Sequence, residues 1–503
     1  MVEKIVLLVV FFAVMIFVGI HSRKHTKSVS DFVLGGRAVG PWLTAFAFGT
    51  SYFSSVVFVG YAGQFGWNFG ISATWIGIGT ALLGSLLAWV VLGRRTRVMS
   101  NHLSASTMPE FFEKRYDSKV LKIVASAIIF IFMIPYTASI YNGLSKLFGM
   151  AFDIPYEVCV IVMAVLTGVY VIAGGYMATA INDFIQGIIM LIGIVAVIWS
   201  VLNGQGGFTE AFSKLAAVES EVPGAYSSIF GPDPMGLLSV VILTSLGTWG
   251  LPQMVQKFYT IKDEKSIKTG TVISTVFAFV VAGGSYFLGG FGRLFDPANF
   301  TGADGKIAFD SIVPHMLSSL PNLLIGIVVV LVLSASMSTL SSLVMTSSST
   351  LTLDFLKGTV AKNMKEKTQL VTMRILIAIF IALSVIIALD PPTFIAQLMG
   401  ISWGAMAGSF LAPFMYGLYW KGVTKSGVWA SFVCGVGITV ANMFIGFLPN
   451  SIYAGAVAMI AGLIVTPIVS LVTPKLKKEI VEESFSCYQV SIKDRNKESL
   501  IKE

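Results

Sequence analysis

Long apolar runs separated by short polar segments make up most of the chain. About thirteen of these runs reach the roughly 20 residues that a helix needs to cross a bilayer. The predicted spans lie near residues 4–20, 42–68, 71–93, 120–148, 155–173, 178–202, 235–258, 270–292, 318–352, 370–389, 393–419, 427–447 and 450–473. The first run has no small-residue cleavage site and further spans follow it, so we expect it to remain as a membrane anchor. The pattern predicts an all-α polytopic membrane protein.

Two of the predicted spans carry helix-breaking residues near their middle. The second span holds a polar, glycine-containing stretch at 49–55, and the seventh holds Gly247, Gly250 and Pro252. Glycine tolerates unwound dihedrals and proline removes a backbone donor, so both helices are predicted to be interrupted. A pair of interrupted spans in corresponding halves is typical of inverted-repeat secondary transporters. Two kinked helices at tight crossings are the open alternative.

Composition and charge place the chain in a membrane rather than on a nucleic acid. Hydrophobic residues make up 55% and charged residues 12%, whereas soluble proteins carry about 25% charged residues. If the N-terminus lies outside, nearly all of the 34 Lys and Arg residues fall on the cytoplasmic side. The exceptions are Lys4, Lys146, Lys214, Arg293 and Lys306. We therefore predict a multi-pass protein of the cell membrane with a cytoplasmic C-terminus, despite the tempting net charge of +8.

The stretch 331–355 is rich in Ser and Thr although it lies inside an apolar span. On a helix, Ser338, Ser341 and Ser342 share one face, and Ala335 lies one turn before Ser338 and Thr339. Hydroxyl and carbonyl oxygens are the ligands that a small, hard cation prefers. The cluster therefore predicts a cation site. For each single residue, close helix packing with the hydroxyl bonded back to its own helix is the alternative.

Asp183 is the one carboxylate that we place within the apolar zone. A membrane-embedded acid is costly unless it is paired, hydrated or bound to a metal, so it is a candidate functional residue. A helix cap together with Asn182 is the alternative. No Lys or Arg is predicted at mid-membrane, which argues against a permanent salt bridge there.

Four segments together resemble the sodium:solute symporter family, over about residues 5–475. They read YVIAGGYMATAINDFIQGIIMLIG from 170, GLPQMVQKFYTIKD from 250, ASMSTLSS from 335, and ISWGAMAGSFLAPFMYGLYWKGVTKSGVWAS from 401. In the second segment, Leu251, Gln253 and Lys257 replace the family's Gln, His and Arg. The resemblance implies a LeuT-type five-plus-five inverted repeat. The ten-helix transport core would cover 42–420, with an extra helix and loop at 1–41, two extra helices at 421–474 and a cytoplasmic tail at 475–503.

The resemblance also implies the ion sites. The main sodium site would use the carbonyls of Thr50, Phe53 and Ala335 and the hydroxyls of Ser338 and Thr339. Some members hold a second sodium ion, and the matching positions here are Ser338, Ser341, Ser342 and Asp183. The implied function is sodium-coupled import of a small organic solute by alternating access, without enzymatic activity, in a chain that works as a monomer.

The solute is expected beside the two helix breaks, near mid-membrane. Candidate lining residues are polar or aromatic and come from five predicted core helices: Ser51, Tyr52, Ser54, Ser55, Trp75, Tyr136, Asn142, Thr248, Trp249, Gln253, Gln397, Ser402 and Trp403. Each of them has helix packing or interface anchoring as its alternative. With no arginine expected at depth, a monocarboxylate, an amino acid or a pantothenate-like solute fits best.

Rival functions share parts of this pattern. A proton-coupled symporter of the same fold would use Asp183 as the proton carrier, and a sodium/sugar symporter is a further alternative. A channel fits a desolvated cation site with broken helices less well. A membrane enzyme is not expected, because the sequence contains no H-E-x-x-H and its four histidines lie in loops or near helix ends.

Overall fold

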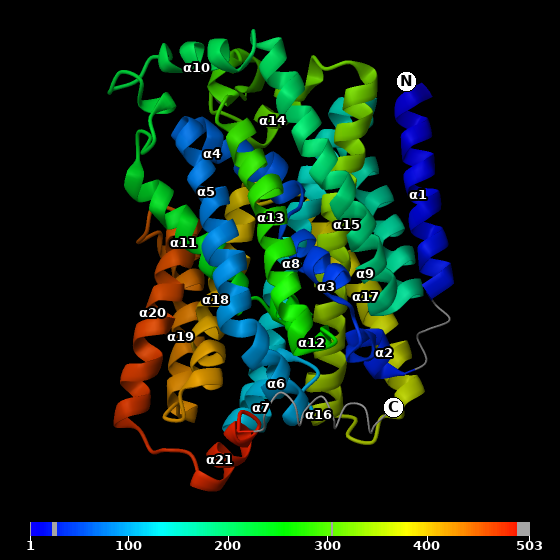
Figure 1. Cartoon of the computed structure of the whole chain (residues 1–503), viewed down its shortest axis with the longest axis vertical. Helices are drawn as coiled ribbons and strands as arrows, with labels where there is room; N and C mark the ends of the chain where they lie inside the picture. The colour runs from blue at the N-terminus through cyan, green and yellow to red at the C-terminus, as the bar shows by residue number, and fades with distance from the viewer. Residues whose placement is uncertain (1, 23–27, 303–304, 490–503) are drawn as a thin grey trace.

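The chain folds as a bundle of helices that run between two opposite ends (Figure 1). The computed structural model describes residues 2–22, 28–302 and 305–489, and within these residues no β-strand forms beyond two isolated bridges. The start of α1 lies at the upper end in Figure 1, together with α10 and α14, and the helices α6, α7, α16 and α21 lie at the lower end.

The helices have the following bounds in chain order. They are α1 Val2–Ser22, α2 Val29–Leu34, α3 Pro41–Tyr52, α4 Ala62–Phe69, α5 Thr74–Gly79, α6 Arg94–His102, α7 Met108–Tyr116, α8 Lys119–Phe152, α9 Tyr156–Gly204, α10 Phe208–Ala216, α11 Pro234–Gly250, α12 Pro252–Thr260, α13 Glu264–Gly289, α14 Phe309–Ser318, α15 Asn322–Thr350, α16 Lys357–Thr359, α17 Glu366–Leu389, α18 Ile395–Tyr419, α19 Lys425–Ile445, α20 Ser451–Val472 and α21 Lys478–Ser486. Wider π-type turns at Val56–Tyr61, Thr80–Leu87, Trp89–Gly93 and Leu351–Leu356 continue several of these helices.

Among the described residues, ten helices are long and apolar enough to cross a membrane, or up to eleven if one bent pair is a single span. One of the ten, Val56–His102, covers the outer part of the second predicted span and the whole of the third. The apolar helix Tyr156–Val169 falls short of the length required. The total of thirteen spans therefore stays a prediction.

Both predicted interruptions are present. The first break follows α3, where Phe53 is extended (φ −95°, ψ 116°) before helical turns resume at Val56. The second break is at Leu251 (φ −79°, ψ 123°), between α11 and α12, whose axes differ by 45°. Pro252 begins α12, where its missing N–H costs nothing because the first turn has no helical acceptor.

Helix α15 forms the centre of the bundle. All its residues from 328 to 350 are buried, and it packs against α1, α3, α8, α9 and α17. Two of its lower Ser residues follow the packing alternative: Ser348 Oγ donates to the Val344 carbonyl at 2.7 Å, and Ser349 Oγ to the Thr346 carbonyl at 3.2 Å. The protons of these two hydroxyls are used within the helix. Thr346 Oγ1 instead donates to Gln256 Oε1 of α12 at 2.8 Å, and Ser347 Oγ has no partner.

Asp183 is not alone among buried carboxylates, but the other two lie outside the predicted spans, so its place as the one acid in the apolar zone stays a prediction. Asp354, just beyond α15, is fully buried, accepts a 2.6 Å hydrogen bond from Thr107 Oγ1 and lies 3.7 Å from Lys122 Nζ. Asp310 on α14 is also buried and accepts a hydrogen bond from the Ile395 N–H at 3.2 Å. Both of these acids have partners, whereas neither oxygen of Asp183 has one.

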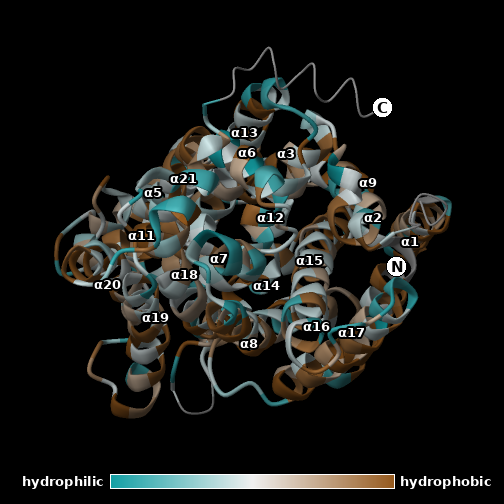
Figure 2. Ribbon diagram, turned by 90° about the horizontal axis from the view of Figure 1, so that it is seen from below, coloured by the Kyte–Doolittle hydropathy of each residue, from teal (hydrophilic) through white to brown (hydrophobic). Residues whose placement is uncertain are grey.

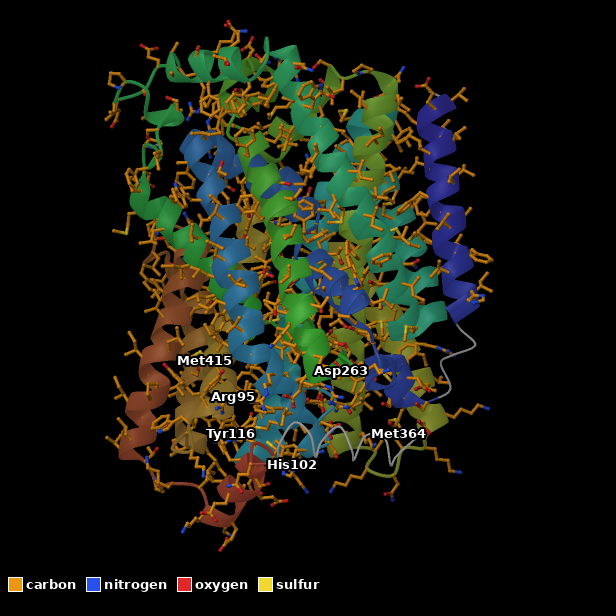
Figure 3. All side chains as sticks on the ribbon, in the orientation of Figure 1. Arg95, His102, Tyr116, Asp263, Met364 and Met415 are labelled. Atoms are coloured by element: carbon orange, nitrogen blue, oxygen red, sulfur yellow. The ribbon has the colours of Figure 1, made fainter. Side chains whose placement is uncertain are left out.

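The lower end of the bundle carries a charged surface. Seen from below in Figure 2, hydrophobic colouring is strong on α17 and α20 at the rim, and hydrophilic colouring marks α7. Figure 3 shows Arg95, His102 and Tyr116 at this end. Helix α21 packs on α6 and α7, with Phe485 beneath the Arg115 guanidinium at 4.9 Å. Part of the predicted tail is thus a docked helix, and residues 490–503 of that tail lie outside the described residues.

Two glycines set the approach of α4 to α13. A Cβ on Gly66 would overlap the carbonyl of Gly289, and a Cβ on Gly289 would overlap the carbonyl of Ala62. Only glycine permits this backbone-to-backbone contact, as at other close crossings in membranes.

We therefore expect Gly289→Ala to lower the free energy of unfolding by about 1–3 kcal/mol, the usual cost of overpacking. Thermal unfolding of the purified protein in detergent measures this. The matched control is Gly437→Ala in α19, where a Cβ would meet nothing within 4 Å. Equal melting temperatures for the two variants would contradict the close crossing.

Candidate functional site

The break after α3 turns two carbonyls away from their own helix. Helix α3 ends at Tyr52, and the carbonyls at a helix end have no helical N–H to accept from. The chain beyond the break is held in place by other elements: the Ser55 N–H lies 3.3 Å from Ser336 Oγ, and Ser55 Oγ donates to the Ile140 carbonyl at 2.8 Å. The Thr50 and Phe53 carbonyls are therefore free to meet α15.

Five oxygens converge between this break and α15. Ser338 Oγ lies 3.2 Å from the Thr50 carbonyl and 3.0 Å from the Ala335 carbonyl. Thr339 Oγ1 lies 3.1 Å from the carbonyls of Thr50 and Phe53 and 3.0 Å from that of Ala335. All five residues are fully buried. The structure thus brings together every residue of the predicted main sodium site.

The five oxygens fit a cation because the two hydroxyls have too few protons to give every neighbouring carbonyl oxygen a hydrogen bond. Each hydroxyl has one proton and can donate it to one acceptor at a time. Ser338 and Thr339 together have two protons, yet each faces more than one carbonyl oxygen at about hydrogen-bond distance. In the remaining contacts, a lone pair of a hydroxyl oxygen faces a lone pair of a carbonyl oxygen. A small hard cation at the centre would convert that repulsion into attraction, and these residues would hold it through oxygen atoms alone.

The residues of the predicted second ion site do not converge in the same way. Ser341 Oγ donates to the Ser338 carbonyl at 2.9 Å. Ser342 Oγ shares a 2.9 Å hydrogen bond with Ser51 Oγ. The buried Asp183 carboxylate makes no hydrogen bond.

A buried lysine lies at this second group, which sequence reasoning missed. Lys257 on α12 is only 2% exposed, and its Nζ donates to Ser342 Oγ at 3.1 Å. The charge pattern places Lys257 with the cytoplasmic charges at the end of the span near 235–258, whereas the structure buries its side chain on α12. The position of Lys257 one and a half turns after the break was the signal that could have found it.

A small cavity lies beside the first break. It is lined by uncharged residues from five parts of the chain: Tyr52, Val57, Thr80, Thr244, Ala282, Tyr286, Met399 and Trp403. Tyr136 borders Trp403, with ring centroids 5.9 Å apart in an edge-to-face arrangement. Tyr52, Tyr136 and Trp403 were among the predicted solute residues. Thr80, Thr244 and Tyr286 were missed, because no local pattern separates them from ordinary packing residues.

The other predicted solute residues have different neighbours. Thr248 Oγ1 and Trp249 Nε1 donate to the carbonyls of Gly84 and Leu83 at 2.7 and 2.9 Å, so they pack α11 on the neighbouring π-type turn. Ser54 Oγ accepts from the Val56 N–H at 3.2 Å, within the break itself. Asn142 and Gln253 are buried with amide atoms that lack a partner, which keeps both as candidates for contact with a ligand.

Three predicted solute residues lie away from this cavity. Trp75 is 44% exposed and donates to the Ile229 carbonyl at 3.0 Å, outside the bundle core. The Gln397 side chain accepts from Ser451 Oγ at 2.6 Å and so joins α18 to α20. Ser402 Oγ donates to the Phe132 carbonyl. Their hydrogen-bonding capacity is used in helix packing.

Comparison with known proteins gives matches in sequence. A model of the sodium:solute symporter family matches residues 32–435. The sodium/proline symporter of Staphylococcus aureus (strain NCTC 8325 / PS 47) is 31% identical over 494 residues, which cover 95% of this chain and 93% of the relative. The sodium/proline symporter of strain COL matches with the same identity and coverage.

Solved structures match the fold. A Na⁺-coupled sialic acid symporter in a substrate-bound, outward-open state superposes with a TM-score of 0.76 at 18% identity, covering 94% of this chain and 98% of that one. Mhp1, a nucleobase-cation-symport-1 family transporter in a closed conformation, superposes with a TM-score of 0.53 at 13% identity, covering 90% and 97%. These likenesses confirm the predicted LeuT-type fold.

The family match and the apolar helices define a multi-pass membrane protein of the secondary-transporter class. The chain belongs to the sodium:solute symporter family. It is a symporter that couples Na⁺ to a small organic solute, as predicted, and it is not an enzyme.

The oxygen cluster gives a direct prediction for ion binding. Thr339→Val keeps the shape of the side chain but removes the oxygen that faces three carbonyls. One lost contact to a charged group is worth about 1.5–3 kcal/mol, so we expect sodium affinity to fall about 10- to 100-fold. Binding of radiolabelled sodium to the purified protein measures the change.

The matched control is Ser348→Ala on the same helix, whose hydroxyl bonds only within α15. It should bind sodium as the wild type does. Wild-type affinity in Thr339→Val would show that the ion is held elsewhere.

Proposed function

We propose that the solute is proline or a closely similar small zwitterionic amino acid, taken up with sodium held by the five-oxygen cluster. The observation that carries the proposal is the shared turn at the end of α3. Thr50 and Phe53 supply two carbonyls to the cluster, and Tyr52, between them, lines the cavity. An ion that fixes the backbone of residues 50–53 also fixes the side chain that faces the solute.

The residues that line the cavity suit a small zwitterion, and the cavity, about 10 Å³ in this structure, has to widen to admit one. No charged side chain lines it, and its hydroxyl and aromatic groups come from Thr80, Thr244, Tyr52, Tyr286 and Trp403. An apolar ring would pack on the aromatic faces. The charges of a zwitterion would meet the ends of the broken helices, where free N–H and C=O groups favour a carboxylate and an ammonium group respectively. The name of the relatives, sodium/proline symporter, favours proline over a monocarboxylate or a pantothenate-like solute.

Coupling follows from reciprocal stabilisation. Sodium joins α3 to α15, and this same arrangement shapes the cavity, so each ligand favours the conformation that the other needs. A membrane potential of about 100 mV, negative inside, adds roughly 2.3 kcal/mol for each positive charge that moves inward. A single ion therefore supplies useful driving force for accumulation of the solute.

The orientation of the chain is also part of the proposal. We place the end that carries α6, α7 and α21 in the cytoplasm, because Arg94, Arg95, Arg97, Lys114 and Arg115 gather on the first two of these helices. The N-terminus of α1 then lies outside. The cluster and the cavity are formed within one chain, which supports a functional monomer with a transport core at 42–420.

Uptake into proteoliposomes tests the proposal. We expect radiolabelled proline to accumulate under an inward sodium gradient, to accumulate more when the inside is negative, and not to accumulate when choline replaces sodium. Unlabelled pantothenate, lactate and glucose serve as competitors in the same assay.

Sodium-driven uptake of one of those competitors, without competition by proline, would reject the solute. Uptake that follows a pH gradient and ignores sodium would reject the ion and favour the proton-coupled alternative.

A further inference from the structure

Lys257 stands where four elements meet. It is carried by α12, the lower half of the second broken helix, and its Nζ donates to Ser342 on α15 at 3.1 Å. The ammonium lies 5.1 Å from the ring of Tyr176 on α9. Ser342 in turn shares its hydrogen bond with Ser51 on α3. A single buried charge thus links both broken helices to the central helix.

Asp183 is the electrostatic partner of this lysine. Both side chains are buried, and each lies within electrostatic range of the other. The two do not form a direct ion pair, and both carboxylate oxygens lack hydrogen-bond partners. A buried ammonium without a nearby negative charge would be strongly unfavourable. An ammonium on Lys257 and a carboxylate on Asp183 would therefore stabilise each other.

The hydroxyls of this group are already engaged. Ser341 Oγ donates to the Ser338 carbonyl, and Ser342 Oγ accepts from Lys257 and bonds to Ser51. A sodium ion placed between Ser342 and Asp183 would lie close to the ammonium and would be repelled by it. The residues present therefore do not fit a second sodium ion, although their types match the predicted set.

We infer that the Lys257 ammonium is a tethered cation that takes the place of a second sodium ion, so that this chain binds one sodium ion per solute. The inference rests on the proposed sodium-coupled function and deepens it. The Lys257 ammonium supplies the positive charge that a second ion would supply, and it contacts Ser342 Oγ as such an ion would. It also joins α12 to α15 without an ion. Because Lys257 belongs to the protein, its charge is not delivered to the cytoplasm.

Counting bound sodium ions on the full-length protein tests the inference. Radiolabelled sodium is titrated to saturation on purified protein in nanodiscs, with the protein concentration measured by amino-acid analysis. The wild type should bind one ion per chain. Lys257→Gln keeps a hydrogen-bonding group near Ser342 but removes the charge, so it should bind two. The matched control is Lys262→Gln, five residues further on at an exposed position, which should bind one.

The outcomes separate this inference from the proposed function. Two ions on the wild type would overturn the inference while leaving sodium-coupled uptake intact. One ion on both the wild type and Lys257→Gln would also overturn it, because the ammonium would then not be what excludes the second ion. If Lys257→Gln does not fold, the wild-type count decides alone. No bound sodium and no sodium dependence of uptake would reject the proposed function itself.

Discussion

The structure depends on the convergence of uncharged oxygens at one point in the bundle. Helix α3 stops at Tyr52, and its last carbonyls meet two hydroxyls of α15 that cannot satisfy them all. Water is absent from the hydrocarbon interior, so such a group of acceptors is stable only if something positive joins them. In our proposal, ion binding offsets the cost of leaving a helix incomplete at membrane depth, which would link folding of the break to transport.

The two broken helices meet the need for positive charge near their breaks in different ways. The break in α3 presents neutral oxygens suited to a mobile cation, whereas the helix after the second break brings its own cation, Lys257. The mobile cation at the first break and the fixed ammonium of Lys257 have different effects on transport. On this proposal, the first is exchanged between the two sides of the membrane and drives uptake, and the second holds α12 to α15. The unpartnered Asp183 then balances a resident charge.

Much of this arrangement could be predicted from the sequence, because its causes are local. Glycine and proline marked both breaks, and the spacing of Ser338 and Thr339 placed two hydroxyls on one helix face. The structure adds what depends on contacts between distant segments. Thr80, Thr244 and Tyr286 line the cavity only because three helices cross there, and Trp75 faces away from it although its type suits a solute site. Lys257 was missed because its burial depends on contacts with Ser342 and Tyr176, which other helices bring to it.

The most direct measurement is a high-resolution structure determined in sodium chloride and again in choline chloride. In sodium, we expect a density peak in contact with Thr50 O, Phe53 O, Ala335 O, Ser338 Oγ and Thr339 Oγ1, at distances shorter than the 3.0–3.2 Å that separate these oxygens here. In choline, the peak should vanish. A sodium-dependent peak elsewhere, with Ser338 and Thr339 still bonded to the same carbonyls, would contradict the account.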